Sequence, residues 1–226
     1  MATSFPTSLD SFTNPSASDA LDSVSVPHAD QHSNLNDAVE ALQAKVGVDG
    51  STVTSSLDYQ RGLVHIDTFT GTGVSAANFD DVFTSDFDAF RVVVRLRTLP
   101  SNLFLRYRVG GVDSTAANYN YVLHGLSSAG SALNVNSSGA IYQQLAQTNI
   151  SSTVARQGCV FDVIYPNLAY HTTIMGAGQS YNTGGNYWTY NVGGAHVLNN
   201  AYDGFSIFPV SGTISHTTSI YGYNNG

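Results

Sequence analysis

Two histidines, His28 and His32, stand four residues apart at the start of a helical pattern. In a helix this spacing places both imidazole rings on one face, where they can meet one metal ion. No glutamate or third ligand accompanies them as in the zinc-protease helix motif. The pair therefore has three interpretations: polar residues of a helix seam, ligands for water or an anion on an oligomer axis, or a structural metal site. We favour the first and expect neither a metal nor a cofactor.

A second candidate is the segment MGAGQSYNTGGNYWTYNVGGAH, residues 175–196, which combines aromatic rings and amides among glycines. Sugars present apolar C–H faces and hydroxyl edges, so aromatic platforms beside amide and backbone groups suit them. The plainer interpretation, which the pattern favours, is a hairpin loop whose rings alternate between core and rim. The candidate glycan-binding residues are Tyr181, Asn182, Asn186, Tyr187, Trp188 and Tyr190.

Five of the seven arginines lie in FRVVVRLRTLPSNLFLRYRVGG, although the chain has a formal charge of -8. The segment alternates as two strands, and Pro100-Ser101-Asn102 is expected to turn the chain, which predicts a hairpin with one apolar and one mostly basic face. Arginine suits an anionic glycan or a phosphate-bearing polymer, because its guanidinium offers forked donors to carboxylates and phosphates. Pairing with upstream aspartates or with a neighbouring subunit is favoured, because carboxylates stand close by at Asp80, Asp81, Asp86 and Asp88. The basic face comprises Arg91, Arg95, Arg97, Arg106 and Arg108.

Signals for catalysis are weak. Glu40 is the only glutamate, so a glycosidase-type carboxylate pair has to come from aspartates such as Asp162 or Asp203. No nucleophile elbow, phosphate loop or dinucleotide fingerprint stands in its required context. The single cysteine, Cys159, reads as a buried strand residue. We therefore expect a protein that is not an enzyme.

The helix that carries the histidines is expected to span residues 28–46, since Pro27 suits its first turn and Gly47 the left-handed residue after its end. Its apolar residues form a narrow seam at 4-3-4 spacing, the coiled-coil pattern, so we expect the helix to pair with copies of itself. The residues alone permit a dimer as readily as a trimer. The seam consists of His28, His32, Leu35, Val39, Leu42 and Val46.

From Val64 onward, short alternating segments are separated by Gly, Asn, Ser and Pro without helical patterns between them. This predicts an antiparallel β-sandwich or barrel. We expect an extended arm at 1–27, the coiled-coil helix at 28–47, a linker at 48–63 and the β domain at 64–226.

The acidic balance of 8 basic against 16 acidic residues argues against binding to nucleic acid or to anionic membranes, since both require a basic footprint. The first residues lack the pattern of a secretory signal, and no segment has the roughly 18 apolar residues of a membrane span. We expect folding in a reducing cytosol.

The run SLDSFTNPSASDALDSVSVPHADQHSNLNDAVEALQAKVGV resembles the N-terminal region of tailed-bacteriophage minor structural and fibre proteins. In those proteins a Ser/Thr/Pro arm leads into an H-x-x-x-H-x-x-L-N-D-A-x-x-A-L-x-x-K-V-G helix. The segments FDAFRVVVRL, NLFLRYRVGG, SAANYNYVLHG and AYDGFSIFPVSGTISHTTSIYGYNNG resemble, in the same order, their C-terminal jelly-roll domain. The resemblance covers nearly the whole chain.

The resemblance implies a virion appendage made in the bacterial cytoplasm and displayed on the particle surface. Residues 1–27 would dock into capsid or tail proteins, and a mostly β chain would end in an antiparallel jelly-roll β-sandwich. It also implies a homotrimer and contact with host surface polysaccharide. Two rivals stay open: a capsid or tail decoration protein that strengthens the particle, and a glycan-cleaving spike.

Overall fold

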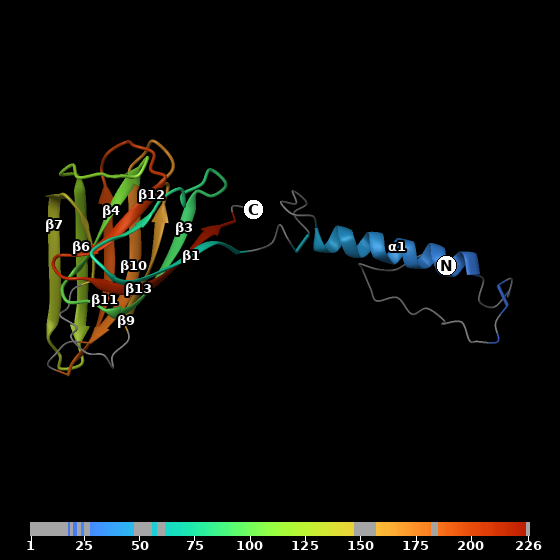
Figure 1. Ribbon diagram of the computed structural model, residues 1–226, viewed down its shortest axis with the longest axis horizontal. Helices are drawn as coiled ribbons and strands as arrows, with labels where there is room; N and C mark the ends of the chain where they lie inside the picture. The colour runs from blue at the N-terminus through green and yellow to red at the C-terminus, as the bar shows by residue number, and fades with distance from the viewer. Residues whose placement is uncertain are drawn as a thin grey trace. The chain divides into compact units, whose positions relative to one another are not determined.

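The computed structural model describes residues 18, 20, 21, 24, 28–47, 56–57, 62–146, 157–181 and 185–224. The chain divides into two compact units, Met1–Gly62 and Leu63–Asn225 (Figure 1). Among the described residues, the first unit holds one α-helix and the second holds all the strands. Most of the expected arm at 1–27 and of the expected linker at 48–63 lies outside the described residues.

The helix α1 spans His28–Val46, the range that the sequence pattern predicts. Asp30 in its first turn and Lys45 in its last turn carry the charges that a helix dipole favours at those ends. Gly47 has a φ of 87°, and its N–H donates to the Gln43 carbonyl at 2.8 Å. The helix therefore ends at a left-handed glycine, as expected.

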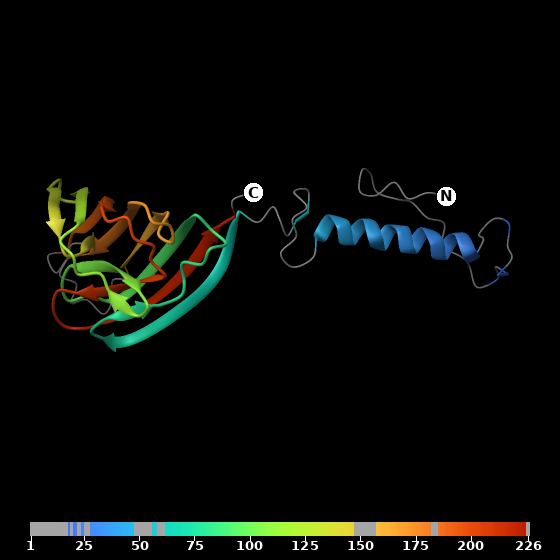
Figure 2. The ribbon, with the colours of Figure 1, turned by 90° about the horizontal axis from the view of Figure 1, so that it is seen from above.

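The second unit consists of two antiparallel sheets (Figures 1 and 2), which confirms a mostly β chain. The eight-stranded sheet has the order β1 (Leu63–Val74), β13 (Ile214–Tyr223), β3 (Ala89–Thr98), β9 (Gln157–Ile164), β10 (Thr172–Tyr181), β11 (Tyr187–His196), β6 (Tyr119–Ser127) and β7 (Ala132–Ala140). The five-stranded sheet has the order β2 (Ala77–Phe79), β12 (Gly204–Pro209), β4 (Leu103–Val109) and β5 (Val112–Asp113), and β8 (Gln143–Ala146) also pairs with β4.

Three segments of the chain connect the larger sheet with the smaller one, and they lie side by side where they bend. The order β1-β13-β3 in the larger sheet returns as β2-β12-β4 in the smaller one. At the bend the Val210 N–H donates to the Asn102 carbonyl at 3.2 Å, and the Ser211 N–H donates to the Ser101 hydroxyl at 3.1 Å. The predicted β3–β4 hairpin is therefore wrong: Pro100-Ser101-Asn102 carries the chain around a corner, and each strand pairs with other partners.

The two sheets enclose one hydrophobic core. Phe161 of β9 and Phe205 of β12, from opposite sheets, have ring centroids 6.3 Å apart. Strands alternate between buried and open positions, as in β6, where every second residue is buried. Cys159 belongs to this core, as expected, and burial raises the pKa of its thiol to about 12. Its thiolate is therefore strongly disfavoured.

Candidate functional site

The five arginines expected on one basic face are divided between the two sheets. Arg91, Arg95 and Arg97 alternate along β3 with buried valines and a buried leucine, so they lie on the outer face of the eight-stranded sheet, which points away from the core. Arg106 and Arg108 alternate along β4 with buried Tyr107 and belong to the five-stranded sheet. A single basic face does not form, because β3 and β4 do not pair.

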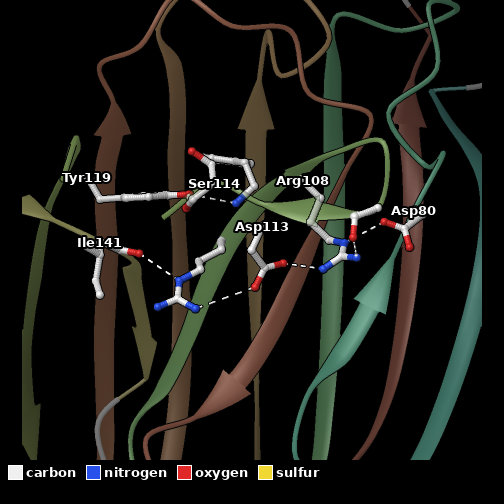
Figure 3. A network of polar contacts seen from close by, with 9 residues as sticks. Asp80, Arg108, Asp113, Ser114, Tyr119 and Ile141 are labelled. Carbon is white, nitrogen blue, oxygen red and sulfur yellow. Dashed lines mark hydrogen bonds and ion pairs between the residues drawn. The ribbon is translucent and has the colours of Figure 1, made fainter. Parts of the chain in front are cut away.

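Arg108 is the centre of a polar network on the five-stranded sheet (Figure 3). Its Nε donates to the Asp80 carboxylate at 2.7 Å, and its other nitrogens contact the Asp113 carboxylate and the Gly111 carbonyl. Burial alone would lower the pKa of Arg108, but the hydrogen bonds to Asp80 and Asp113 raise it. Asp80 thus has the structural role that the sequence favoured.

Arg106 is held in the same region. Its Nε donates to the Ile141 carbonyl at 3.0 Å, a bond that Figure 3 shows as a dashed line. Its guanidinium carbon lies 4.6 Å from the centroid of the Phe208 ring. A carboxylate oxygen of Asp113 lies 3.8 Å from Arg106. Both arginines of β4 therefore connect parts of the fold.

Arg91 on β3 is also paired. Its Nε and one terminal nitrogen donate to the two carboxylate oxygens of Asp162 at 2.8 and 2.9 Å, and the Tyr223 hydroxyl donates to the same carboxylate at 2.8 Å. Burial alone would raise the pKa of Asp162, but the hydrogen bonds from Arg91 and Tyr223 hold it below its usual value. This fork-to-fork geometry is that of a cross-strand ion pair.

Arg95 and Arg97 differ from the other three. Both are exposed, and neither makes an ion pair with a carboxylate of the described residues. Arg95 makes one long hydrogen bond, 3.4 Å from its terminal nitrogen to the Ser219 hydroxyl. Two guanidinium groups are therefore available on the outer face of an acidic chain.

These arginines border an open depression of about 570 Å³, which we call the outer-face trough. The strand register places Thr217, Arg95, Gly158 and Gln179 in one cross-strand row over β13, β3, β9 and β10. A Cβ on Gly158 would lie 2.5 Å from the Val94 carbonyl oxygen, so glycine allows the strands to approach and leaves the floor of the trough open. The lining residues are Val93, Val94, Arg95, Leu96, Arg97, Gln157, Gly158, Cys159, Val160, Ala177, Gly178, Gln179 and Thr217.

Two tyrosines extend the same face beyond the trough. Tyr181 and Tyr187 are opposite each other in β10 and β11, their ring centroids are 4.8 Å apart, and Tyr187 is 55 % exposed. Tyr181 follows Gln179 by two residues and thus shares its face. β3 and β10 are both antiparallel to β9 and therefore run in the same direction. Arg97 thus follows Arg95 toward the same end of the sheet as Tyr181 follows Gln179. Cations, an amide and aromatic rings therefore occur together, a combination suited to an acidic sugar.

Other residues expected in the glycan-binding loop lie elsewhere. Tyr190 is 2 % exposed and packs over Gly178, where a Cβ would be 2.5 Å from its ring. Trp188 is half-buried and packs against the core. Strand alternation turns both rings inward, so they do not belong to an outer-face site. Asn186 is half-buried, and Asn182 lies outside the described residues.

The apolar residues of the expected seam are exposed on the surface of α1. Leu35, Val39, Leu42 and Val46 are 59 %, 43 %, 52 % and 46 % exposed. The Nε2 atoms of His28 and His32 lie 3.0 Å apart on the same helix. Among the described residues, no group of three or more metal-ligating side chains occurs, and no helix is long and apolar enough to cross a membrane.

Gln179, Thr217 and Gly158 did not emerge as site residues from the sequence. They lie on three strands that are far apart in the chain, and only the register brings them beside Arg95. No protein-family model, curated protein or solved structure matches the chain.

Proposed function

We propose that this protein is a structural appendage of a tailed-bacteriophage particle, which oligomerises through α1 and displays its β unit to acidic polysaccharide on the host surface. The outer-face trough is the observation that carries the binding proposal. The resemblance of the arm and helix sequence to phage fibre proteins supports the virion location. In this proposal residues 1–27 dock into the capsid or tail, and the assembled protein is a homotrimer.

The seam of α1 supports self-association. Four apolar side chains at 4-3-4 spacing, each at least 43 % exposed, are the pattern by which a coiled coil buries its seam against identical helices. A helix of 19 residues is marginal alone, so contacts between β units must contribute. Replacing Leu35 and Leu42 by Ser should lower the mass in solution from three times the 24.0 kDa chain mass to the chain mass itself. Light scattering measures this, and wild-type protein at the mass of one chain would contradict the proposal.

We also propose a jelly roll for the β unit. Its support is the set of three segments that bend together between the sheets, with β1-β13-β3 matched by β2-β12-β4. Jelly rolls consist of two antiparallel sheets with Greek-key connections, and strands that switch sheets at a bend join such packed sheets.

Ligand recognition rests on Arg95 and Arg97, the two guanidinium groups of the basic residues that make no ion pair with the described residues. An exposed arginine offers forked donors to a carboxylate, and Gln179 and Thr217 in the same cross-strand row offer hydrogen bonds to hydroxyls. Tyr181 and Tyr187 add aromatic rings at one end. An acidic sugar has a carboxylate for the arginines, hydroxyls for Gln179 and Thr217, and an apolar C–H face for the tyrosine rings.

The decisive experiment measures binding of the full chain to polygalacturonate, with dextran as the uncharged comparison. Arg95→Gln should weaken polygalacturonate binding about tenfold or more, since a charge-assisted hydrogen bond contributes about 1.5–3 kcal/mol. Arg91→Gln is the matched control, because it removes the same charge from the same strand and face at a residue already paired with Asp162. Binding that is equal in wild type and Arg95→Gln would contradict the proposed site.

A decoration protein is the second candidate, and one observation favours it. Val122, Leu126 and Met175 lie on the outer face and are 55 %, 59 % and 58 % exposed. Apolar side chains gathered on one face suit contact with another protein. Particles that lose stability, but still adsorb to cells, when this protein is absent would favour decoration. Particles that assemble normally and fail to adsorb would favour polysaccharide binding.

The arm has its own test. A chain that lacks residues 1–27 should fold and oligomerise but remain absent from purified particles. Incorporation of the truncated chain at the wild-type level would contradict docking through the arm.

A further inference from the structure

A second open depression, of about 700 Å³, lies where β9 ends and β10 begins. We call it the Tyr165 pocket; its lining residues are Tyr165, Tyr170, His171 and Asn199. The first three belong to the connection between β9 and β10, and Asn199 belongs to the connection between β11 and β12. Tyr181, beside the outer-face trough, is at the opposite end of β10, roughly 30 Å along the strand. The two sites are therefore separate.

The backbone of Tyr165 has an unusual conformation. Its φ is 57°, in the left-handed region that bulky residues rarely adopt. The other non-glycine residue with a positive φ in the described part of the chain is Asp81, a type that tolerates this conformation better. Such strain persists where surrounding contacts enforce it, and it gathers at ligand sites. Tyr165 is also 45 % exposed.

Three anchors hold the connection in this shape. The Tyr165 N–H donates to the Asp88 carbonyl at 2.7 Å, and the Pro166 carbonyl accepts the Tyr202 N–H at 2.7 Å. The Asn167 amide donates to the carbonyls of Thr84 and Phe87 at 2.6 and 2.9 Å. These bonds fix the backbone on both sides of the strained residue, so the pocket needs little ordering when a ligand binds.

The chemistry of the pocket selects an uncharged ligand. Tyr165 and Tyr170 are 45 % and 65 % exposed, so both residues are accessible to a ligand from solvent. Beside them, His171 and Asn199 offer hydrogen bonds, and none of the described residues that line the pocket is an acid, a lysine or an arginine. Its volume lies within the range of small-ligand sites, roughly 300–1,000 Å³. Aromatic faces with neutral hydrogen-bonding groups suit the C–H face and hydroxyls of a pyranose.

From these observations, we infer that the Tyr165 pocket binds a neutral sugar unit of a polysaccharide. The strained backbone at Tyr165 is maintained because it presents the ring to the ligand. This inference does not depend on acidic-sugar binding in the outer-face trough, since the two sites share no residue.

The test uses affinity electrophoresis of the full chain in gels that contain a glucan, a mannan or a galactan. We expect at least one of these neutral polysaccharides to retard the wild-type protein. Tyr165→Gly should weaken that binding at least tenfold while its urea unfolding midpoint stays close to the wild-type value, because glycine adopts a φ of 57° without strain and this relief offsets its greater freedom in the unfolded chain and the lost ring contacts. Loss of binding without loss of stability separates a ligand role from a structural role.

Further variants define the chemistry. Tyr165→Phe should keep binding within a few-fold, since the ring remains, and Tyr170→Ala should weaken binding at least tenfold. Val112→Ala, at a residue that is 68 % exposed on β5, is the control and should bind as wild type.

Two results would overturn the inference: no retardation by any of the three polysaccharides, or wild-type retardation of Tyr165→Gly. The outer-face trough is tested separately. Arg95→Gln should retain neutral-sugar binding, and Tyr165→Gly should retain polygalacturonate binding, so each proposal can fail alone.

Discussion

β3 and β4 have the same alternation of arginines and apolar residues, yet their arginines have different surroundings. Both arginines of β4 are held by carboxylates, carbonyls and an aromatic ring within the fold. On β3, Arg91 is paired with Asp162, whereas Arg95 and Arg97 have no carboxylate partner among the described residues. An arginine's role therefore depends on its cross-strand neighbours and not on the pattern of its own strand.

The neighbours explain the difference. Arg91 lies directly opposite Asp162 in β9, and Arg108 lies opposite Asp113 in β5. Arg95 lies between Gly158 and Thr217, neither of which carries charge. Cross-strand pairs of opposite charge stabilise a sheet modestly. An arginine opposite a glycine lacks that contribution, which leaves it available for a ligand.

Arg108→Ala should have the largest effect on stability. It leaves Asp80 and Asp113 without their shared cation, and we expect the free energy of unfolding to fall by about 3 kcal/mol. The value is at the lower end for a buried pair, because the two carboxylate side chains are 40 % and 25 % exposed and stay partly hydrated. Urea unfolding followed by circular dichroism measures the change.

The double variant Arg108→Ala with Asp113→Ala serves as its control. Removing a carboxylate together with the cation should recover part of the loss, since fewer charges remain unpaired. A single variant with wild-type stability would show that the fold does not depend on the ion pairs of Arg108.

The next largest effect is expected at the floor of the trough. Gly158→Ala places a Cβ 2.5 Å from the Val94 carbonyl oxygen, and backbone atoms cannot yield as a flexible side chain does. We expect a loss of about 2 kcal/mol in the free energy of unfolding, typical of overpacking. Gly193→Ala is the matched control, because nothing lies within 4 Å of a Cβ at that glycine. Equal midpoints for the two variants would mean that β3 and β9 can separate without cost.

A smaller effect should depend on pH. Because the folded protein holds the pKa of Asp162 below 3.8, its pair with Arg91 contributes stability above that pH, which is lost as the pH falls through the folded-state pKa. Asp162→Asn should therefore lower the free energy of unfolding by about 1 kcal/mol at pH 7 and by less near pH 3. Unfolding of both proteins at the two pH values measures this difference. A cost that stays constant with pH would assign the effect to packing instead of charge.

Local patterns in the sequence were enough to predict some of these elements. The bounds of α1 follow from capping chemistry and heptad spacing within 20 residues, and the strands follow from short-range alternation. The course of the chain at Pro100-Ser101-Asn102 was predicted incorrectly. A turn signal marks a change of direction but does not specify whether the next strand pairs with the previous one or enters the other sheet.

The candidate site was predictable only in part, for the same reason. Arg95, Arg97, Gln179, Tyr181 and Tyr187 belong to segments that the sequence singled out. Gln179 was not chosen as a site residue, however, and both Gln179 and Thr217 come beside Arg95 only through the register of four strands. The sequence prediction also did not separate the two faces of β11. It therefore grouped Trp188 and Tyr190, which point inward, with Tyr187, which points outward. The Tyr165 pocket depends on a backbone angle, and no residue pattern marks a tyrosine at positive φ.

The smallest effect on stability is expected at Arg97. Arg97→Ala removes a guanidinium that makes no ion pair with the described residues, so the free energy of unfolding should change by less than about 0.5 kcal/mol. Urea unfolding at low and at moderate salt should give the same small difference, since screening has no native pair to weaken. A loss of 1 kcal/mol or more that disappears with added salt would instead reveal a native partner for Arg97. Of the five arginines on β3 and β4, Arg95 alone would then lack an ion-pair partner among the described residues.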